Sequence, residues 1–398
     1  MLLRERFLII ILLIITFVSA LRVDGELIRI PTAALLIFTL FYFKYNLTII
    51  ITALGFATFC IIHTVFLVFS GQNIIDERLF LADLSMYIAQ LIFYSLVFWS
   101  LDYDKNEFII LNFFKIYLLF TIAIWISSYI SGFNIAVDTS YSTPRAQGLV
   151  TEPSNLSHFL PALIIYFFKS FDVKWLFVAL LTMILTFSPT VYLSLIFTMI
   201  LIGILSINIR SVLYFILPII FIILIVVFNW GIILTSIADF GQFGEMFVRI
   251  IEGFNFIFSG GSTGANSRGV LIYDGMDFMS INGLWWIGTG FGSSNAVAIM
   301  FNDGMLYDAN NWFSFILWFG LPGFVFLLLL HFALLVELRD RFSKSNLTFI
   351  DFLLSGMIIS NTINGGGVWI QHIFFALIVF RLLKLNVSRL SNISNVAI

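Results

Sequence analysis

The chain has 398 residues, of which 61% are hydrophobic and 11% are charged, and its formal net charge is −2. A soluble domain carries roughly a quarter charged residues, so this composition excludes an ordinary water-soluble fold and favours the lipid bilayer as solvent. There is no basic tail and no run of like charges, which argues against a nucleic-acid partner.

The sequence predicts an all-α integral membrane protein in which about twelve apolar segments cross the bilayer as helices. The apolar run that follows Met1 is taken as the first membrane helix and not as a cleaved leader. The run 174–207 is too long for one crossing, and Ser188-Pro189 is its predicted break. The predicted spans are 7–22, 28–43, 47–70, 79–101, 108–130, 155–170, 174–187, 189–207, 211–232, 311–336, 349–363 and 368–386.

Two connections, 131–154 and 233–310, are much longer than the others, and loops of this length are more often functional than idle. With the N-terminus in the cytoplasm, most of the 20 Lys and Arg residues fall on the cytoplasmic side, as the positive-inside rule requires. We therefore expect a single polytopic membrane domain over 1–398, with both termini in the cytoplasm and both long loops facing outward.

The strongest local signal closes the first long loop, where Arg145-Ala146-Gln147-Gly148 is followed by Glu152-Pro153-Ser154 and then by an apolar segment. A charge at the membrane boundary costs free energy unless it is paired or solvated. One interpretation is structural, because Pro153 suits the first helical position and its polar neighbours suit a helix start. The other interpretation is that Arg145 and Glu152 are held together at the rim of a cavity.

This segment resembles the O-antigen polymerase (Wzy) family, within the wider superfamily of membrane O-antigen ligases and polymerases. Its members carry Arg-x-x-Gly and then Glu-Pro-Ser at the end of an external loop, which corresponds here to Arg145, Gly148, Glu152, Pro153 and Ser154. The resemblance implies a polytopic enzyme of the bacterial inner membrane, whose two long loops face the periplasm.

Further stretches are similar to the same family, so the resemblance covers roughly 140–330. Leu185 to Thr190 is similar to a Thr-x-Ser segment, although Pro189 stands where an arginine is usual. The other similar stretches are Ser267-Arg268, the glycine-rich run from Trp286 to Gly292, Asn310-Asn311-Trp312, and Phe319 to Gly323. The N-terminal third matches in hydropathy alone.

The resemblance implies that the substrate is an undecaprenyl-pyrophosphate-linked oligosaccharide and that a chain-length regulator protein is a partner. An arginine suits a pyrophosphate leaving group, because its planar fork stays charged and makes bidentate contacts. The only basic residues of the two long loops are Arg145, Arg249 and Arg268. We expect Arg145 and Arg268 to bind the pyrophosphate. Arg249 is a weaker third choice, because glutamates one helical turn to either side can pair with it.

Glu152 is the first candidate for the base that deprotonates the acceptor hydroxyl, although it can equally serve only to orient Arg145. The further candidates for substrate binding are the motif positions Gly148, Ser154, Asn310 and Asn311, together with His158 and His372 near the predicted outer surface. The sequence offers no metal-ligand spacing, and we expect neither a metal nor another cofactor.

Two other readings stay open. An O-antigen ligase, which transfers glycan to the lipid A core, has a similar layout but tends to carry a functional histidine in its large outer loop. The loop 233–310 contains no histidine, which favours the polymerase. A lipid-linked oligosaccharide flippase needs charged residues spread through its helices, whereas this chain concentrates its polar residues in two loops.

Overall fold

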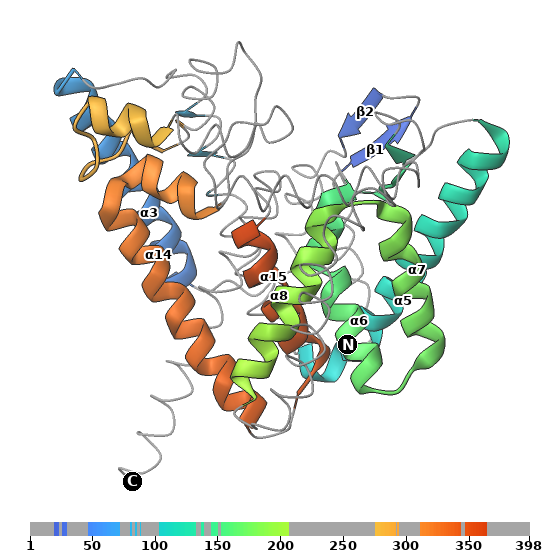
Figure 1. The fold of residues 1–398 in the computed structure, drawn as a ribbon. Coiled ribbons are helices and arrows are strands. Elements are labelled where there is room, and N and C mark those ends of the chain that lie inside the picture. The colour runs from blue at the N-terminus through green and yellow to red at the C-terminus, as the bar shows by residue number, and fades with distance from the viewer. Residues whose placement is uncertain are drawn as a thin grey trace, which may run out of the picture. The chain divides into compact units, whose positions relative to one another are not determined.

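The computed structural model describes residues 20–23, 26–29, 47–71, 80–81, 84–85, 88, 103–132, 137–138, 145–149, 153–206, 275–291, 293, 311–343 and 347–363. These residues are mostly helical (Figure 1), which confirms the predicted helical class. Among them, Glu107–Ser131 and Trp312–Ser343 are long and apolar enough to cross a membrane, judged by length and composition. The predicted spans 211–232 and 368–386 lie outside the described residues, as do nearly all of 7–22, 28–43 and 79–101.

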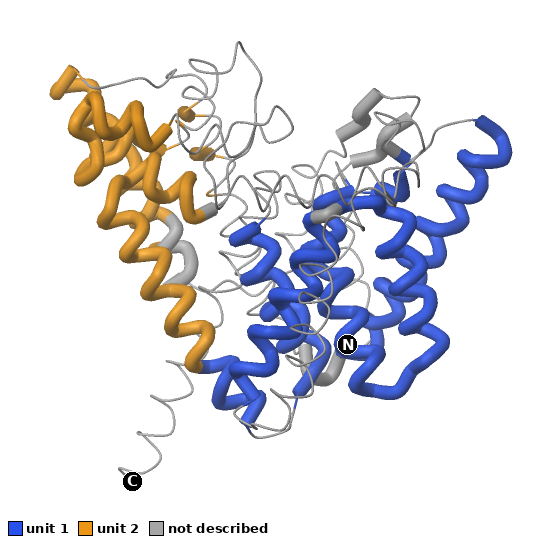
Figure 2. Tube along the Cα trace, viewed as in Figure 1, with its two compact units in different colours: residues 1–32, 103–266, 337–364 blue, residues 33–102, 267–336, 365–398 orange. Residues whose placement is uncertain are grey.

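The chain divides into two compact units, each assembled from three separate stretches (Figure 2). Unit 1 contains 1–32, 103–266 and 337–364, and unit 2 contains 33–102, 267–336 and 365–398. The first-loop motif falls in unit 1, whereas the described part of the second long loop falls in unit 2. Each unit is therefore described by itself.

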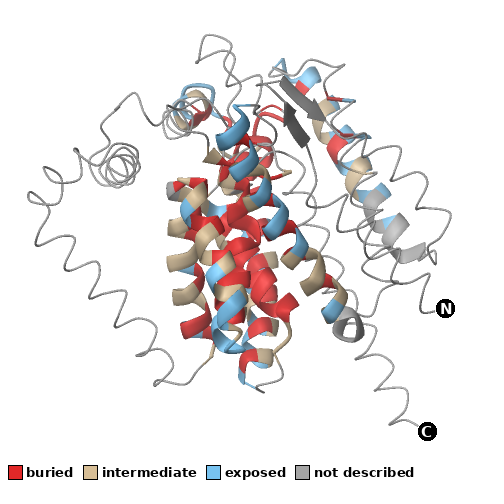
Figure 3. Ribbon diagram, turned by 90° about the vertical axis from the view of Figure 1, so that its right-hand side faces the viewer, coloured by how far each residue is buried: buried red, intermediate tan, exposed pale blue. Residues whose placement is uncertain are grey.

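Unit 1 is built around a helical bundle. Its helices are α5 (Tyr103–Ser131), α6 (Leu160–Lys169), α7 (Val173–Thr186), α8 (Pro189–Leu205) and α15 (Phe349–Ile363), with the 3₁₀ helix η1 (Pro153–His158) before α6. Helix α6 packs against α7, α8 and α15, and α15 packs in turn on α8 and η1. Buried positions concentrate where these helices face one another (Figure 3). The bounds agree with the predicted spans to within a few residues.

The predicted break between α7 and α8 is confirmed. Helix α7 ends at Thr186, and Phe187 adopts a left-handed conformation with φ of 44°. Ser188 is extended, and Pro189 then opens α8. Proline suits a first helical position because it has no N–H to leave unpaired, whereas inside a helix it breaks the hydrogen-bond ladder.

Two short ladders of strands occur, and the first corrects a prediction. Strands β1 (Ala20–Val23) and β2 (Glu26–Arg29) form an antiparallel hairpin, so the end of predicted span 7–22 and the start of span 28–43 are wrong. Asp24-Gly25 lies between the strands in sequence, and this dipeptide is the strongest short-range hairpin signal. Inside the first long loop, β3 (Val137–Asp138) pairs antiparallel with β4 (Arg145–Ala146).

The described part of unit 2 contains α3 (Leu47–Phe69), the segment 275–291 and most of α14 (Asn311–Ser343). The bounds of α3 match the helix predicted over 47–70. Helix α14 folds back on itself at Gly320, where φ is 66° and ψ is −160°. The rings of Trp312 and His331 lie 4.5 Å apart, although a straight helix would separate these residues by about 28 Å.

The backbone groups that the bend releases are paired with the loop before α14. Pro322 has no N–H to give the carbonyl of Trp318, which instead accepts from the Gly290 N–H at 3.0 Å. The Leu321 N–H turns away to the Trp285 carbonyl at 2.7 Å, and the Thr289 N–H reaches the Leu317 carbonyl. The bend therefore leaves these buried groups paired, as folding requires.

The bend also changes the predicted span 311–336. The helical range begins at the predicted residue but continues to Ser343, and it is straight only after Gly320. That straight part is about 34 Å long at 1.5 Å per residue, which is enough to cross a bilayer. Residues 311–319 form a separate half-helix that folds back against it.

Candidate functional site

The first part of the motif is held in a turn on the surface of α5. Arg145 lies in β4, half-buried, with Asp138 of β3 as its partner in register. Strand β4 packs against α5 and α7. Ala146 and Gln147, which follow Arg145, are buried. The arginine is thus attached to a backbone that the bundle fixes in place.

Gly148 explains the spacing of the motif, because no other residue fits its place. Its φ is +67°, and a Cβ added there would lie 2.8 Å from Thr121 Oγ1 and 2.9 Å from the Tyr117 hydroxyl oxygen. The same Tyr117 hydroxyl accepts a hydrogen bond from the Leu149 N–H at 2.9 Å. The glycine therefore permits both the left-handed turn and its close approach to α5.

The second part of the motif is held by the same face of α5. Pro153 begins η1, and Phe159 directly follows it. The Phe159 ring lies 5.0 Å from that of Phe114 and 5.3 Å from that of Tyr117, measured between centroids. One column of α5 side chains thus supports the chain on both sides of Glu152. Glu152 itself lies outside the described residues.

Buried polar groups gather around η1 at this end of unit 1. His158 ends η1 and is fully buried, and the Ser157 hydroxyl lies 2.5 Å from that of Ser360 in α15. Within the part of the chain that the structure describes, neither ring nitrogen of His158 has a hydrogen-bond partner, and neither do the buried polar side-chain atoms of Ser194, Thr198 and Asn361. We call this region, with β4, the Arg145 end of unit 1.

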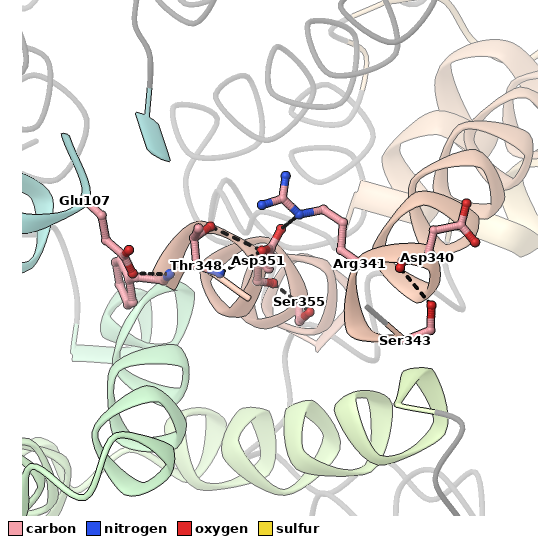
Figure 4. Close-up of polar contacts among 8 residues, drawn as sticks. Glu107, Asp340, Arg341, Ser343, Thr348, Asp351 and Ser355 are labelled. Atoms are coloured by element: carbon pink, nitrogen blue, oxygen red, sulfur yellow. Dashed lines mark hydrogen bonds and ion pairs between the residues drawn. The ribbon is translucent and has the colours of Figure 1, made fainter. Parts of the chain in front are cut away.

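The other end of unit 1 also buries a charged group, Asp351, but there the carboxylate has several partners (Figure 4). The Asp351 carboxylate is fully buried and lies 2.8 Å from the Arg341 Nε. It also accepts from the Thr348 N–H at 3.0 Å and from the Thr348 hydroxyl at 3.2 Å. The bond to the N–H is the carboxylate half of a capping box at the start of α15. The Glu107 carboxylate accepts from the Phe349 N–H at 2.6 Å.

Further charges collect at this second end, which we call the Asp351 end. Lys115 lies 3.4 Å from the Asp172 carboxylate, and the Lys169 ammonium lies 5.2 Å from the Phe352 ring centre. Described basic residues of unit 1 near this end are Lys115, Lys169, Lys174, Arg339 and Arg341. Arg145 lies at the opposite end, where the β1–β2 hairpin, which carries Arg22 and Arg29, contacts β3. The two ends of the bundle therefore differ in how many basic residues they carry.

The glycine-rich run that begins at Trp286 has a structural task. A Cβ on Gly288 would lie 2.4 Å from the Trp318 carbonyl oxygen, and the N–H groups of Gly288, Thr289 and Gly290 all donate to backbone carbonyls. The Ile287 carbonyl accepts a hydrogen bond from the His63 Nε2 at 2.7 Å. The Thr289 and Gly290 amides hold the loop on α14, and the Ile287 carbonyl holds it on α3. The three amides are therefore not available to cradle a phosphate.

The structure brings four predicted site residues together in unit 1, namely Arg145, Gly148, Ser154 and His158. Asn311 is the first residue of α14 and belongs to unit 2. The other predicted site residues, Glu152, Arg249, Arg268, Asn310 and His372, lie outside the described residues. Within the described ranges, no group of three His, Cys, Asp or Glu side chains is placed to hold a metal ion.

Sequence reasoning missed Tyr117, Ser194, Thr198 and Asn361. Each lies inside an apolar helix, where a single hydroxyl or amide is a weak signal because it can bond to its own backbone. A possible signal for α8 is the spacing of Ser194 and Thr198, which places both on one face of the helix.

The chain matches no protein-family model, no curated protein sequence and no solved structure. Functional inference therefore depends on its own residues and on the local resemblance of the motif.

Proposed function

We propose that the protein is a membrane glycosyltransferase that polymerises lipid-pyrophosphate-linked oligosaccharide repeat units at the outer face of the bacterial inner membrane. The observation that carries this proposal is the geometry of the motif. One face of α5 contacts both the Gly148 turn, three residues after Arg145, and Phe159, which follows η1 and lies seven residues after Glu152. Both sides of the proposed site therefore share one rigid support, as a preorganised charge pair needs.

The surface of the helices supports a membrane location. Exposed large apolar side chains recur along the described helices, for example Ile116, Leu119 and Ile130 in α5 and Val325 and Leu329 in α14. Soluble monomers seldom expose contiguous apolar patches of this extent. We extend this proposal to about twelve crossings with both termini in the cytoplasm.

The charge difference between the ends supports the orientation. Basic residues gather at the Asp351 end of unit 1, and the positive-inside rule assigns such an end to the cytoplasm. The Arg145 end then faces the periplasm, where lipid-linked repeat units would be joined. In this less charged setting, Arg145 would bind an anionic ligand through charge-assisted hydrogen bonds.

The proposed reaction transfers a glycan from its pyrophosphate to an acceptor sugar. The acceptor hydroxyl oxygen attacks the anomeric carbon of the donor, and the bond between that carbon and the pyrophosphate oxygen breaks with its electron pair. The hydroxyl proton passes to a base, for which Glu152 is the first candidate. Arg145 and Arg268 would stabilise the charge that develops on the leaving pyrophosphate. Arg249 and the remaining motif residues would contact the substrate.

The test is complementation of a strain that lacks the native gene, with the glycan ladder separated on a gel. Arg145→Ala, Arg268→Ala and Glu152→Gln are each expected to collapse the ladder toward a single repeat. Arg339→Ala is the matched control, because it removes an exposed arginine from the Asp351 end. Immunoblots of the membrane fraction check that each variant is present. A full ladder from the Arg145 and Arg268 variants, or no ladder from the wild-type gene, would overturn the proposal.

The orientation has a separate test. Cys60 is buried and is the only native cysteine, so introduced cysteines can be labelled over a low background. In spheroplasts, a membrane-impermeant maleimide is expected to label Ser131→Cys, at the outer end of α5, and not Ser343→Cys, at the end of α14. The reverse labelling pattern contradicts the orientation without bearing on the enzymatic activity.

A further inference from the structure

The buried polar atoms at the Arg145 end are unusual because their own helices do not satisfy them. Elsewhere in the bundle, buried hydroxyls bond to the carbonyl one turn back, as Thr182 does to Val178 and Ser355 does to Asp351. Ser194 and Thr198 are equally buried in α8, yet neither makes such a bond in the described structure. A buried hydroxyl without a partner costs free energy, so these groups call for an explanation.

Asn361 and His158 extend the same pattern from the neighbouring elements. The Asn361 amide is 1% exposed and the His158 ring is fully buried, and both polar atoms of each side chain lack a partner among the described residues. An amide and an imidazole can each donate one hydrogen bond and accept another. Together they can bind a group that also donates and accepts.

The elements that carry these residues pack on one another. Helix α8 contacts both η1 and α15, and α15 contacts η1. The Ser157–Ser360 hydrogen bond joins the positions next to His158 and Asn361 in sequence. Gly356 of α15 lies close to the same segment, since a Cβ there would be in ordinary van der Waals contact with Ala162 and with the His158 carbonyl oxygen, at 3.4 and 3.9 Å. These three elements pack on one another, and each carries a buried polar side chain without a partner among the described residues.

We propose that His158, Ser194, Thr198 and Asn361 form a buried site between η1, α8 and α15 that binds an uncharged, hydroxyl-bearing group. The inference rests on the proposed function, in which that group is a hydroxyl of the acceptor sugar or a water molecule in its place. The four side chains include no carboxylate and no permanent cation. A buried pyrophosphate or divalent cation would thus be uncompensated, whereas a neutral hydroxyl can both donate to and accept from these groups.

The position of the site fits an acceptor role. His158 ends the same 3₁₀ helix that begins directly after Glu152, the first candidate for the base. The proposed binding residue for the donor pyrophosphate is Arg145, which precedes the Gly148 turn. In the sequence, the Gly148 turn and His158 therefore lie on either side of Glu152, so the donor and acceptor groups are assigned to the two flanks of the motif.

The experiment compares matched threonines in the purified protein. Thr198→Val and Thr182→Val each remove one fully buried hydroxyl from neighbouring helices, but only that of Thr182 is satisfied by its own helix. The substrate is the lipid-linked repeat unit isolated from the strain that carries the gene. The initial rate at which the protein joins two of these repeat units is measured. Thr198→Val and Asn361→Leu are expected to lower the rate at subsaturating substrate roughly three- to tenfold, the effect of one lost hydrogen bond. Thr182→Val is expected to leave it unchanged.

A binding measurement separates the two proposals. The free oligosaccharide, released from the lipid by mild acid, is expected to raise the melting temperature of the wild-type protein in detergent and not that of Asn361→Leu. If the wild type polymerises while all three variants match it in rate and in melting shift, the inference is overturned and the polymerase stands. If the wild type does not polymerise, the melting shift alone decides: a shift lost in Asn361→Leu supports the site, and no shift in the wild type, or an equal shift in Asn361→Leu, overturns it.

Discussion

The two ends of α15 bury polar side chains in opposite ways. At its start, Asp351 is fully enclosed and is matched by Arg341 and by both polar groups of Thr348. At its end, Asn361 is almost as deeply enclosed, yet its amide has no partner in the described structure. The same helix thus has one end that is electrostatically complete and one that leaves hydrogen-bonding capacity unused.

The difference separates groups that stabilise the fold from groups that are available for function. Removing a partner from a satisfied buried network should destabilise the protein strongly, because a charge or donor is left unpaired. Removing an unpaired buried group should cost little stability and affect only ligand binding. This contrast can be tested by variants along unit 1, in decreasing order of expected effect.

The largest effect is expected at the Asp351 end. Arg341→Ala would leave the fully buried Asp351 carboxylate without its cation and should lower the free energy of unfolding by about 3–5 kcal/mol. Denaturation of the detergent-solubilised protein measures the change. Arg339→Ala removes an exposed arginine two positions away and should stay within about 0.5 kcal/mol. Equal losses from both variants would show that the Arg341–Asp351 ion pair contributes no more to the free energy of unfolding than an exposed arginine does.

A smaller loss is expected at the motif turn. Gly148→Ala combines a strained φ with contacts to Tyr117 and Thr121 that are too short for a methyl group, and should cost about 2–4 kcal/mol. Gly132 is the control, because its φ is +70° and a Cβ there meets no described atom within 4 Å. Gly132→Ala should cost only the strain of the backbone, about 1–2 kcal/mol. The difference between the two melting curves isolates the contact with α5.

Tyr117→Phe should act on the same turn more gently. The Leu149 N–H would lose its acceptor, which should cost about 1 kcal/mol, while the packing of the ring on Phe159 is kept. We also expect a shorter glycan ladder, because the turn that carries Arg145 would be held less firmly. Tyr129→Phe, which removes an exposed hydroxyl from the same helix, provides the control. Ladders of equal length from both variants would contradict a positioning role for Tyr117.

The smallest effect on stability is expected at the Asn361 end. Asn361→Leu and Thr198→Val remove unpaired buried polar atoms, so the free energy of unfolding should change by less than about 0.5 kcal/mol or should rise slightly. Thr182→Val breaks a satisfied hydrogen bond and should lower it by about 1 kcal/mol. The order of melting temperatures in ligand-free detergent checks this. Greater destabilisation by Thr198→Val than by Thr182→Val would mean that Thr198 has a structural partner in the folded protein.

Hydropathy alone located much of the bundle. The helices predicted at α3, α7, α8 and α15 agree with the structure to within a few residues, because the position of each helix depends on the apolar residues of its own segment. The break at Ser188-Pro189 could be predicted in the same way, because a proline inside a helix removes a backbone hydrogen bond and clashes with the preceding turn. The hairpin at 20–29 was missed although its Asp24-Gly25 signal is local, because the longer apolar runs on both sides dominated the interpretation.

The candidate site was predicted in part from the sequence of the motif. Its residue types fit both a helix start and a charge pair, and the structure adds that Arg145, Gly148, Ser154 and His158 lie in one unit. The reason for the glycine came only from the structure, because the obstacle to a side chain is Tyr117, a residue far away in sequence.

The helical class and the positions of several helices could be predicted from the residues alone, because they depend on interactions between neighbours along the chain. The bend in α14, the helix that supports the motif turn and the pairing of buried polar groups depend instead on contacts between residues far apart in sequence. A Cβ on Gly320 would lie 2.5 Å from the Trp285 carbonyl oxygen, and whether Asn361 has a partner depends on the elements that surround it. Satisfaction of a buried group is a property of its three-dimensional surroundings, so no local pattern can reveal it.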